Sequence, residues 1–253
     1  MVVEGVKIMI GLSSGEIIRQ AGFLPHFMGL QKPDNTLTIT VSGQSPASSR
    51  NTIAEQALIN ECTHVFFIDD DMMLPPDVLF KLLAHDKDIV SALYLLRTFP
   101  HLPAFFDVAF DNGFNKYAFL DSNMEVGLQK GVNAGLGCVL IKTEVFKTLE
   151  KPWVRLGEII KDGWFDDIGF FNRCVKAGFD VYCDTATPVG HMMTATLWPE
   201  KHGDKWFTCY KHANGNIMFP QQIPTEAEVE ADKEKNLAQS AELAKVAEPV
   251  LST

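Results

Sequence analysis

The chain has 253 residues, of which 46% are hydrophobic and 21% are charged, and its formal net charge is −10. This length and composition predict one large globular domain or two small ones, and they exclude a chain that is disordered throughout. The acidic balance also excludes a broad electrostatic surface for nucleic acid.

Membrane and export signals are not evident in the sequence. No apolar run approaches the roughly 20 residues that a membrane-spanning helix needs. The N-terminal segment carries an early acid, Glu4, and no basic region, which predicts a strand rather than a signal peptide. Five cysteines without a C-x-x-C pair fit a reducing compartment, so we expect a cytoplasmic protein.

The first hundred residues alternate between predicted strands and helices. Ser49 is the expected N-cap of the second helix, which places Arg50 in its first turn, where anions are favoured. The alternation predicts an α/β fold with a Rossmann-like, mostly parallel sheet flanked by helices. Strands are expected over residues 6–11, 36–41, 65–68 and 88–95, and helices over residues 17–30, 50–61 and 77–85.

The pattern changes after Arg97. Residues 98–129 are rich in aromatic side chains and predict short antiparallel strands, with a hairpin turn at residues 111–113. The elements expected next are a strand over 138–142, a helix over 144–149, a helix that opens at Asp166 or Asp167 and ends at Gly178, and a strand over 179–183.

We expect one catalytic domain over residues 1–224, with halves near 1–97 and 98–224. Residues 225–253, with seven acids and three lysines, predict a charged helix or a disordered tail.

Three consecutive carboxylates follow the third predicted strand. The apolar run 65–68 stops at Asp69, Asp70 and Asp71, and open α/β sheets bind ligands at the carboxyl ends of their strands. Side chains alternate along an extended chain, so Asp69 and Asp71 are expected on one face. Two such carboxylates repel each other unless a cation lies between them, and Mg²⁺ or Mn²⁺ binds one or two carboxylates together with substrate phosphates. The alternative is a solvated acidic turn.

Other residues have both a functional and a structural interpretation. Ser13 and Ser14 end the first strand and can open a nucleotide pocket, although no P-loop follows. Arg50 meets a diphosphate or lies at the surface. Trp164 stacks on a sugar or fills the core, and His191 binds a ligand or only forms a hydrogen bond. The pair Asp166 and Asp167 acts in catalysis or caps a helix.

Taken together, these stretches resemble the GT-A glycosyltransferases, specifically the inverting, non-processive group similar to family 2. The resemblance covers roughly residues 5–193. Asp166 stands where Glu is usual, and the Q-x-x-R-W motif of processive membrane synthases is missing. The matching motifs are Asp69-Asp70-Asp71 as the D-x-D, Ser49-Arg50-Asn51 before it, Gly135-Leu136-Gly137-Cys138 with Val145-Phe146, and Asp166-Asp167-x-x-Phe170-x-x-Arg173 followed by Gly178-Phe179 and Gly190-His191.

The resemblance implies a role for each matching residue. Asp69 and Asp71 would hold Mn²⁺ or Mg²⁺ against the diphosphate of a nucleotide-sugar, with a UDP-sugar as the expected donor, and His191 would complete the metal shell. Asp167, or failing that Asp166, would be the general base on an acceptor hydroxyl. The remaining residues expected at the donor are Ser13, Ser14, Arg50, Asp70 and Trp164.

Three alternatives remain open from the sequence. A nucleotidyltransferase also uses carboxylates and a metal, but it should carry a basic, glycine-rich loop after the first strand, where this chain has Leu12-Ser13-Ser14-Gly15-Glu16. An inactive relative would bind carbohydrate or nucleotide without transfer. Retaining enzymes share the D-x-D and the fold. The sugar, the acceptor and the oligomeric state are not predicted.

Overall fold

The structure is a computed structural model that divides into two compact units, residues 1–193 and residues 194–253. It describes residues 3–14, 20–97, 101–109, 115–117, 126–155, 159–160, 163–164, 166–193, 195–203, 205–212 and 221–222. Within this part of the chain, no helix is long and apolar enough to cross a membrane.

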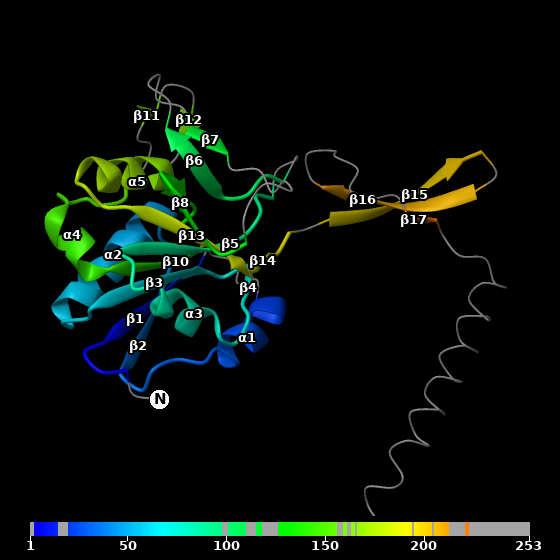
Figure 1. Ribbon diagram of the computed structural model, residues 1–253. Helices are drawn as coiled ribbons and strands as arrows, with labels where there is room; N and C mark the ends of the chain where they lie inside the picture. Colours follow the sequence, from blue (N-terminus) through cyan, green and yellow to red (C-terminus); the bar gives the residue numbers. More distant parts are fainter. Residues whose placement is uncertain are drawn as a thin grey trace, which may run out of the picture. The chain divides into compact units, whose positions relative to one another are not determined.

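A seven-stranded sheet forms the centre of the first unit (Figure 1). Its order is β2-β1-β3-β10-β5-β13-β8, and β10 and β8 run opposite to the other five strands. The predicted α/β fold with a mostly parallel sheet is therefore confirmed. The strands are β1 (Ile8–Ser14), β2 (Thr36–Ser42), β3 (His64–Asp69), β5 (Ile89–Leu93), β8 (Leu128–Gly131), β10 (Cys138–Lys142) and β13 (Val181–Pro188).

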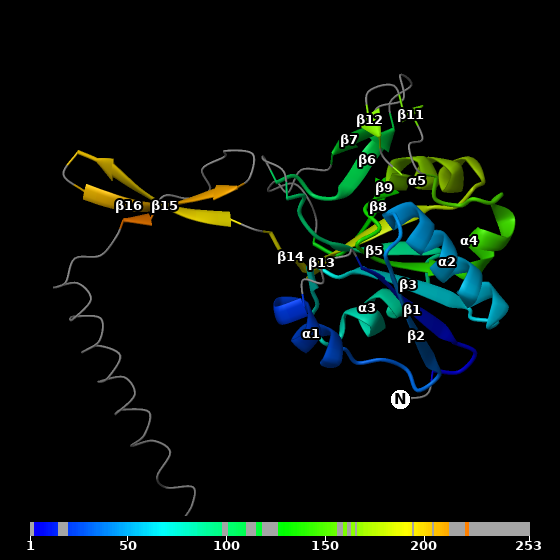
Figure 2. The ribbon, with the colours of Figure 1, turned by 180° about the vertical axis from the view of Figure 1, so that it is seen from behind.

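Helices cover both faces of this sheet, as Figures 1 and 2 show from opposite sides. One buried cluster contains side chains of α2, α4 and α5, and the other contains side chains of α1 and α3. The helices are α1 (Gln20–Met28), α2 (Pro46–Ile59), α3 (Val78–Ala84), α4 (Thr143–Thr148) and α5 (Asp166–Lys176).

Strand β3 is buried on both faces, as its uninterrupted apolar run predicts. Val65 and Phe67 pack in the cluster of α2, α4 and α5, whereas Phe66 and Ile68 pack in the cluster of α1 and α3. Side chains of successive strand residues point to opposite faces, so four consecutive apolar residues fill both clusters. Burying both faces fixes the register of β3 and therefore where the strand ends.

Short antiparallel ladders surround the central sheet. The strands β6 (Phe105–Ala109), β7 (Asn115–Tyr117) and β9 (Asn133–Ala134) pair together, in agreement with the antiparallel strands expected after Arg97. The hairpin turn expected at residues 111–113 lies outside the described residues. Two further pairs are β4 (Met72–Met73) with β14 (Gly190–His191), and β11 (Ile159–Ile160) with β12 (Gly163–Trp164).

The second unit contains a three-stranded antiparallel sheet of β15 (Ala195–His202), β16 (Lys205–His212) and β17 (Gln221–Gln222). The division between the units falls after residue 193. The expectation of a single catalytic domain over residues 1–224 stays a prediction, and the tail over residues 225–253 lies outside the described residues.

The ends of two helices test the capping predictions. Helix α2 begins at Pro46 with Ser45 as its N-cap, so the prediction of a cap at Ser49 is wrong and Arg50 lies beyond the first turn. Proline favours the first helical position, where its missing N–H is not needed, and Ser45 Oγ accepts the Ser48 N–H at 3.2 Å. Helix α5 ends as predicted, because Gly178 has a φ of +94° and the Phe179 N–H bonds to the Cys174 carbonyl.

Replacing the two serines separates these N-cap assignments. Ser45→Ala removes the capping hydrogen bond and should lower the free energy of unfolding by about 1 kcal/mol. Ser49→Ala is the matched control, because Ser49 Oγ is buried with no hydrogen-bond partner among the described residues. Its loss should change stability by less than about 0.5 kcal/mol. Urea unfolding of both variants checks this, and a larger loss for Ser49→Ala would restore the sequence-based assignment.

Candidate functional site

The predicted site residues meet at the carboxyl ends of β1 and β3. These strands are parallel, and their register places Ser13 opposite Asp69. The Asp69 N–H also bonds to the Gly137 carbonyl at 2.9 Å, which brings the start of β10 to the same edge. Strand β3 ends at Asp69, and Asp70 and Asp71 form a turn. The extended backbone therefore ends at Asp69. The alternation of side chains that was expected to continue through Asp71 stops there.

Each of the three aspartates has a different partner. The Arg50 guanidinium donates from Nη2 to both carboxylate oxygens of Asp69 at 3.0 Å. The Ser14 hydroxyl donates to Asp70 Oδ2 at 2.8 Å. Asp71 is buried, and its Oδ2 lies 2.9 Å from Arg97 Nη1. The aspartates are thus part of an organised polar cluster, which argues against a simple solvated turn.

His191 is brought to Asp71 by the ladder of β4 and β14. In this ladder His191 pairs with Met72, and the Met192 N–H bonds to the Asp71 carbonyl at 2.8 Å. The imidazole Nδ1 lies 2.8 Å from the Leu95 carbonyl oxygen, which can only accept, so Nδ1 carries the proton. Nε2 then faces Asp71 Oδ1 at 3.6 Å. A ring nitrogen and a carboxylate oxygen thus face each other at a distance that a shared proton or a bound metal cation can bridge.

Tyr94 packs beneath this pair of residues. Its ring meets the His191 ring edge-on, with centroids 5.4 Å apart, and its hydroxyl accepts the Gly137 N–H at 3.1 Å. A Cβ on Gly135 would lie 1.8 Å from the Tyr94 hydroxyl, and one on Gly137 would lie 2.4 Å from Met72 Cε. A side chain at Gly135 would therefore collide with the Tyr94 ring, whereas one at Gly137 would first displace the flexible end of Met72.

Burial controls the ionisation of the two acids at this edge. It raises the pKa of the Asp69 carboxyl; the Arg50 guanidinium opposes this shift and the neighbouring Asp71 charge adds to it. Burial also raises the pKa of the Tyr94 hydroxyl well above its usual range, followed by the charges of Asp69 and Asp167. Tyr94 therefore stays neutral and serves as a hydrogen-bonding group.

The residues fit a divalent cation in part. Among the described residues, no group of three or more His, Cys, Asp or Glu side chains converges on one point. Asp71 and His191 nevertheless place two potential metal-binding atoms close together, and the other ring nitrogen of His191 bonds to the Leu95 carbonyl, as in most metal-binding histidines. Mg²⁺ commonly takes only one or two carboxylates and fills its shell with water and phosphate oxygens. The Asp69 carboxylate is already paired with Arg50, so it is less available to a cation than Asp71 Oδ1.

The start of α5 carries the other predicted carboxylates. Asp167 is half-buried, and its Oδ1 accepts the N–H of Ile168 at 3.0 Å. The side chains of Asp166 and Trp164 lie outside the described part of the structure. Asn133 on β9 donates to Asn172 Oδ1 at 3.0 Å and so fastens α5 to the sheet. The predicted roles of these residues stay predictions.

Sequence reasoning missed Arg97 and Tyr94. Both follow β5, and neither belongs to a motif that the sequence analysis identified. The available signal was positional, since polar residues just after a buried parallel strand lie at the ligand-binding edge of a sheet. The Leu95 carbonyl that holds His191 was not predictable in this way, because a backbone group has no sequence signature.

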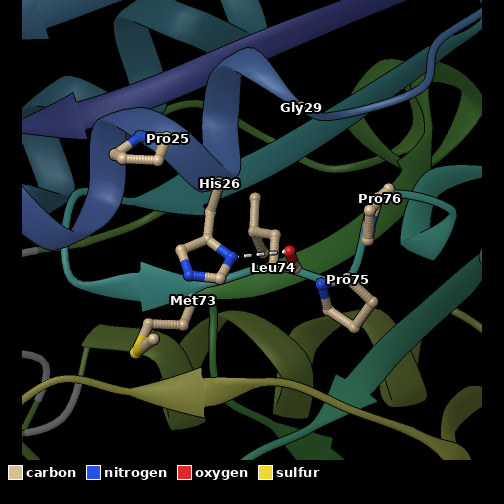
Figure 3. A pocket seen from close by; sticks show the side chains of 7 residues that line it. All are labelled: Pro25, His26, Gly29, Met73, Leu74, Pro75 and Pro76. Carbon is tan, nitrogen blue, oxygen red and sulfur yellow. Dashed lines mark hydrogen bonds between the residues drawn. The ribbon is translucent and has the colours of Figure 1, made fainter. Parts of the chain in front are cut away.

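A concavity lies beside this cluster (Figure 3). Its volume is about 410 Å³, and its lining is mostly apolar. The His26 imidazole donates from Nδ1 to the Leu74 carbonyl at 3.0 Å across it. Met73 connects the two places, because it lines the pocket and pairs with Gly190 next to His191. The lining residues are Pro25, His26, Gly29, Met73, Leu74, Pro75 and Pro76.

Comparison with known proteins identifies the fold. No protein-family model and no curated protein matches this sequence. Among solved structures, A197 from STIV is similar with a TM-score of 0.50 and 15% identity over 87% of this chain and 96% of that protein. GalNAc-T7, crystallised with UDP, GalNAc and Mn²⁺, is similar with a TM-score of 0.53 and 11% identity over 74% of this chain and 44% of that protein. The fold is GT-A-like.

A third similar structure is 4-diphosphocytidyl-2C-methyl-D-erythritol synthase from Anaerococcus prevotii DSM 20548. It has a TM-score of 0.43 and 10% identity over 71% of this chain and 86% of that protein, a similarity too low to support a conclusion. At identities of this order, likeness to A197 and GalNAc-T7 establishes the GT-A-like architecture alone. Membership of the family 2 group is not established by it.

Removing the Tyr94 hydroxyl tests the packing beneath the site. Tyr94→Phe leaves the buried Gly137 N–H without its acceptor and should lower the free energy of unfolding by about 1–3 kcal/mol. Tyr182→Phe is the matched control, because its hydroxyl bonds only to Asp180 at the surface, at 3.4 Å. That variant should change stability by less than about 0.5 kcal/mol. Equal losses in chemical unfolding would contradict the assigned role of Tyr94.

Proposed function

We propose that this chain is a metal-dependent glycosyltransferase that moves a sugar from a nucleotide-sugar to a hydroxyl acceptor. The observation that carries the proposal is the Asp71–His191 pair, whose Nε2 and Oδ1 atoms lie 3.6 Å apart at the ligand-binding edge of a GT-A-like sheet. The Leu95 carbonyl orients the imidazole so that Nε2 faces the carboxylate. The finer assignment is the inverting group similar to family 2, which rests on the motif order in the sequence.

Asp71 and His191 are the proposed ligands of Mn²⁺ or Mg²⁺, with Asp69 adding negative charge beside them. A bound divalent ion would offset the charge that develops on the leaving nucleoside diphosphate. Asp71 is buried and fixed by its backbone bond to Met192, so its position is set before any ligand arrives. A site organised in advance loses little free energy to reorganisation when it binds.

The donor is proposed to lie over the ends of β1 and β3. The Ser14–Asp70 hydrogen bond and the Arg50–Asp69 ion pair form the floor of that position, and Ser13 lies in register with Asp69. The expected donor is a UDP-sugar, in line with the UDP and GalNAc bound in the GalNAc-T7 crystal. Trp164 is proposed to contact the sugar.

Asp167 is proposed as the general base, with Asp166 as the second choice. A sugar hydroxyl is a weak nucleophile, so a carboxylate that accepts its proton as the new bond forms accelerates the reaction. Asp167 lies at the start of α5, and its charge adds to the raised pKa of the Tyr94 hydroxyl. A single displacement of this kind inverts the anomeric carbon.

The first experiment is a binding screen of the purified chain. Thermal unfolding is followed with UDP, GDP, CDP and dTDP and their sugars, each with Mn²⁺ and with EDTA. A ligand at a hundredfold excess over its dissociation constant stabilises the folded state by about 2.7 kcal/mol. A shift that needs both metal and one nucleotide supports the proposal. Binding without donor hydrolysis or transfer indicates an inactive relative, and release of pyrophosphate from a nucleoside triphosphate indicates a nucleotidyltransferase.

Removing either proposed metal ligand should weaken metal-dependent nucleotide binding. Asp71→Ala and His191→Ala are each expected to reduce UDP affinity in Mn²⁺ at least tenfold, and UDP affinity in EDTA should change far less. Asp88→Ala is the control, because this carboxylate pairs with Lys142 at the other end of β10. Calorimetric titration measures the affinities. Unchanged Mn²⁺-dependent affinity in both variants would remove the proposed metal role.

Replacing the proposed base should separate binding from chemistry. Asp167→Asn keeps the size of the side chain and loses the proton acceptor, so turnover should fall about 10²–10⁴-fold. UDP affinity and the thermal midpoint should stay near those of the unmodified chain. Donor consumption in the presence of acceptor glycans is the measurement. Near-normal turnover in this variant, together with loss in Asp166→Asn, would reassign the base.

A further inference from the structure

Arg97 forms an ion pair with Asp71, the carboxylate that the proposed metal would bind. Its Nη1 lies 2.9 Å from Asp71 Oδ2, while His191 Nε2 lies 3.6 Å from the other oxygen of the same carboxylate. The Asp71 side chain is only 8% exposed, so its charge needs a nearby cation. In the structure Arg97 supplies that cation.

The backbone just before Arg97 is held by hydrogen bonds to residues 102–104. The Ala104 N–H bonds to the Tyr94 carbonyl at 2.9 Å, and the Leu96 N–H bonds to the Leu102 carbonyl at 2.8 Å. The Arg97 side chain itself is 36% exposed, so its guanidinium reaches a buried carboxylate from a position open to solvent. The guanidinium can therefore leave Asp71 by side-chain rotation alone.

The charges at the site indicate which ligands would displace the Arg97 guanidinium from Asp71. Asp69, Asp70 and Asp71 bring three negative charges, and Arg50 and Arg97 bring two positive charges close to them. Arg50 is buried and donates to both oxygens of Asp69, whereas Arg97 is the more exposed of the two. A divalent ion at Asp71 and His191 would repel Arg97. A diphosphate beside that ion would attract it, because the planar guanidinium matches two phosphate oxygens.

We propose that Arg97 is an exchangeable counter-ion: it pairs with Asp71 in the free protein, yields that carboxylate to the divalent cation, and then binds the diphosphate of the nucleotide. This inference rests on the proposed function, since it assumes a nucleoside diphosphate as ligand. It makes metal and nucleotide binding cooperative. The metal alone must displace an ion pair, whereas in the presence of the diphosphate the released guanidinium gains a new partner.

The exchange predicts that one substitution of Arg97 raises the affinity for Mn²⁺ alone and lowers the affinity for UDP in Mn²⁺. In Arg97→Gln, Mn²⁺ alone should bind about tenfold more tightly than to the unmodified chain, because its competitor is gone. UDP in saturating Mn²⁺ should bind about tenfold more weakly, because the diphosphate loses its guanidinium. Calorimetric titration of Mn²⁺ alone, and of UDP with Mn²⁺, measures both. Arg155→Gln removes the same charge from an arginine that contacts the Pro152 carbonyl, and it should change neither affinity.

A second variant guards against loss of folding. Arg97→Lys keeps a positive charge beside Asp71, so Mn²⁺ alone should bind within twofold of the unmodified chain. The ammonium cannot engage two phosphate oxygens as a guanidinium does, so UDP in Mn²⁺ should still bind several-fold more weakly. Tighter Mn²⁺ binding by Arg97→Lys, or Mn²⁺ affinity that is unchanged or lower in a folded Arg97→Gln, would overturn the exchange.

These measurements distinguish failure of the inference from failure of the proposed function. The Mn²⁺ titration uses no nucleotide, so it tests the competition at Asp71 whatever the donor is. If the unmodified chain binds Mn²⁺ but no nucleoside diphosphate, the proposed function fails and the diphosphate half of the exchange fails with it. If UDP binds in Mn²⁺ and Arg97→Gln changes neither affinity, the function stands and the exchange is wrong.

Discussion

The buried carboxylate of Asp71 is the constraint on which the candidate site depends. The Asp71 side chain is 8% exposed, so its charge needs compensation; Arg97 supplies it at 2.9 Å, and His191 Nε2 lies 3.6 Å from the other carboxylate oxygen. These two residues come from distant parts of the sequence. The surrounding structure must therefore bring the end of β5 and the strand β14 to the turn that follows β3.

Backbone contacts make that convergence possible. The β4–β14 ladder fixes His191 beside the turn, and the Leu95 carbonyl fixes the orientation of its ring. Gly135 lets the chain before β10 pass close to Tyr94, where a side chain would collide with its ring, and a Cβ on Gly137 would lie 3.1 Å from the Tyr94 hydroxyl. The Tyr94 hydroxyl then accepts the Gly137 N–H, so a buried backbone donor is satisfied where the glycines leave no side chain. The positions of the candidate site residues are thus set largely by backbone hydrogen bonds, glycines and the neutral Tyr94 hydroxyl.

The GT-A-like architecture and the sequence motifs carry different kinds of information. The architecture explains why the candidate site residues gather at the carboxyl ends of β1 and β3, and it is shared with proteins only 11% and 15% identical to this chain. A shared fold does not fix a reaction. The reaction must be argued from the side chains, and here the arginines matter as much as the aspartates. Arg50 orients Asp69, and Arg97 balances the charge of Asp71.

The sequence by itself determined the sheet class, the buried strand β3 and the place where its three aspartates emerge, because hydrophobic burial on both faces leaves a clear pattern along the chain. It also marked Gly178 as the end of α5. It misplaced the start of α2, since Ser45 and Ser49 are both acceptable caps and Pro46 decides between them. Only the tertiary structure paired Asp71 with Arg97 and turned His191 toward it. Such pairings join residues far apart in sequence and use backbone carbonyls, so neither periodicity nor a local motif encodes them.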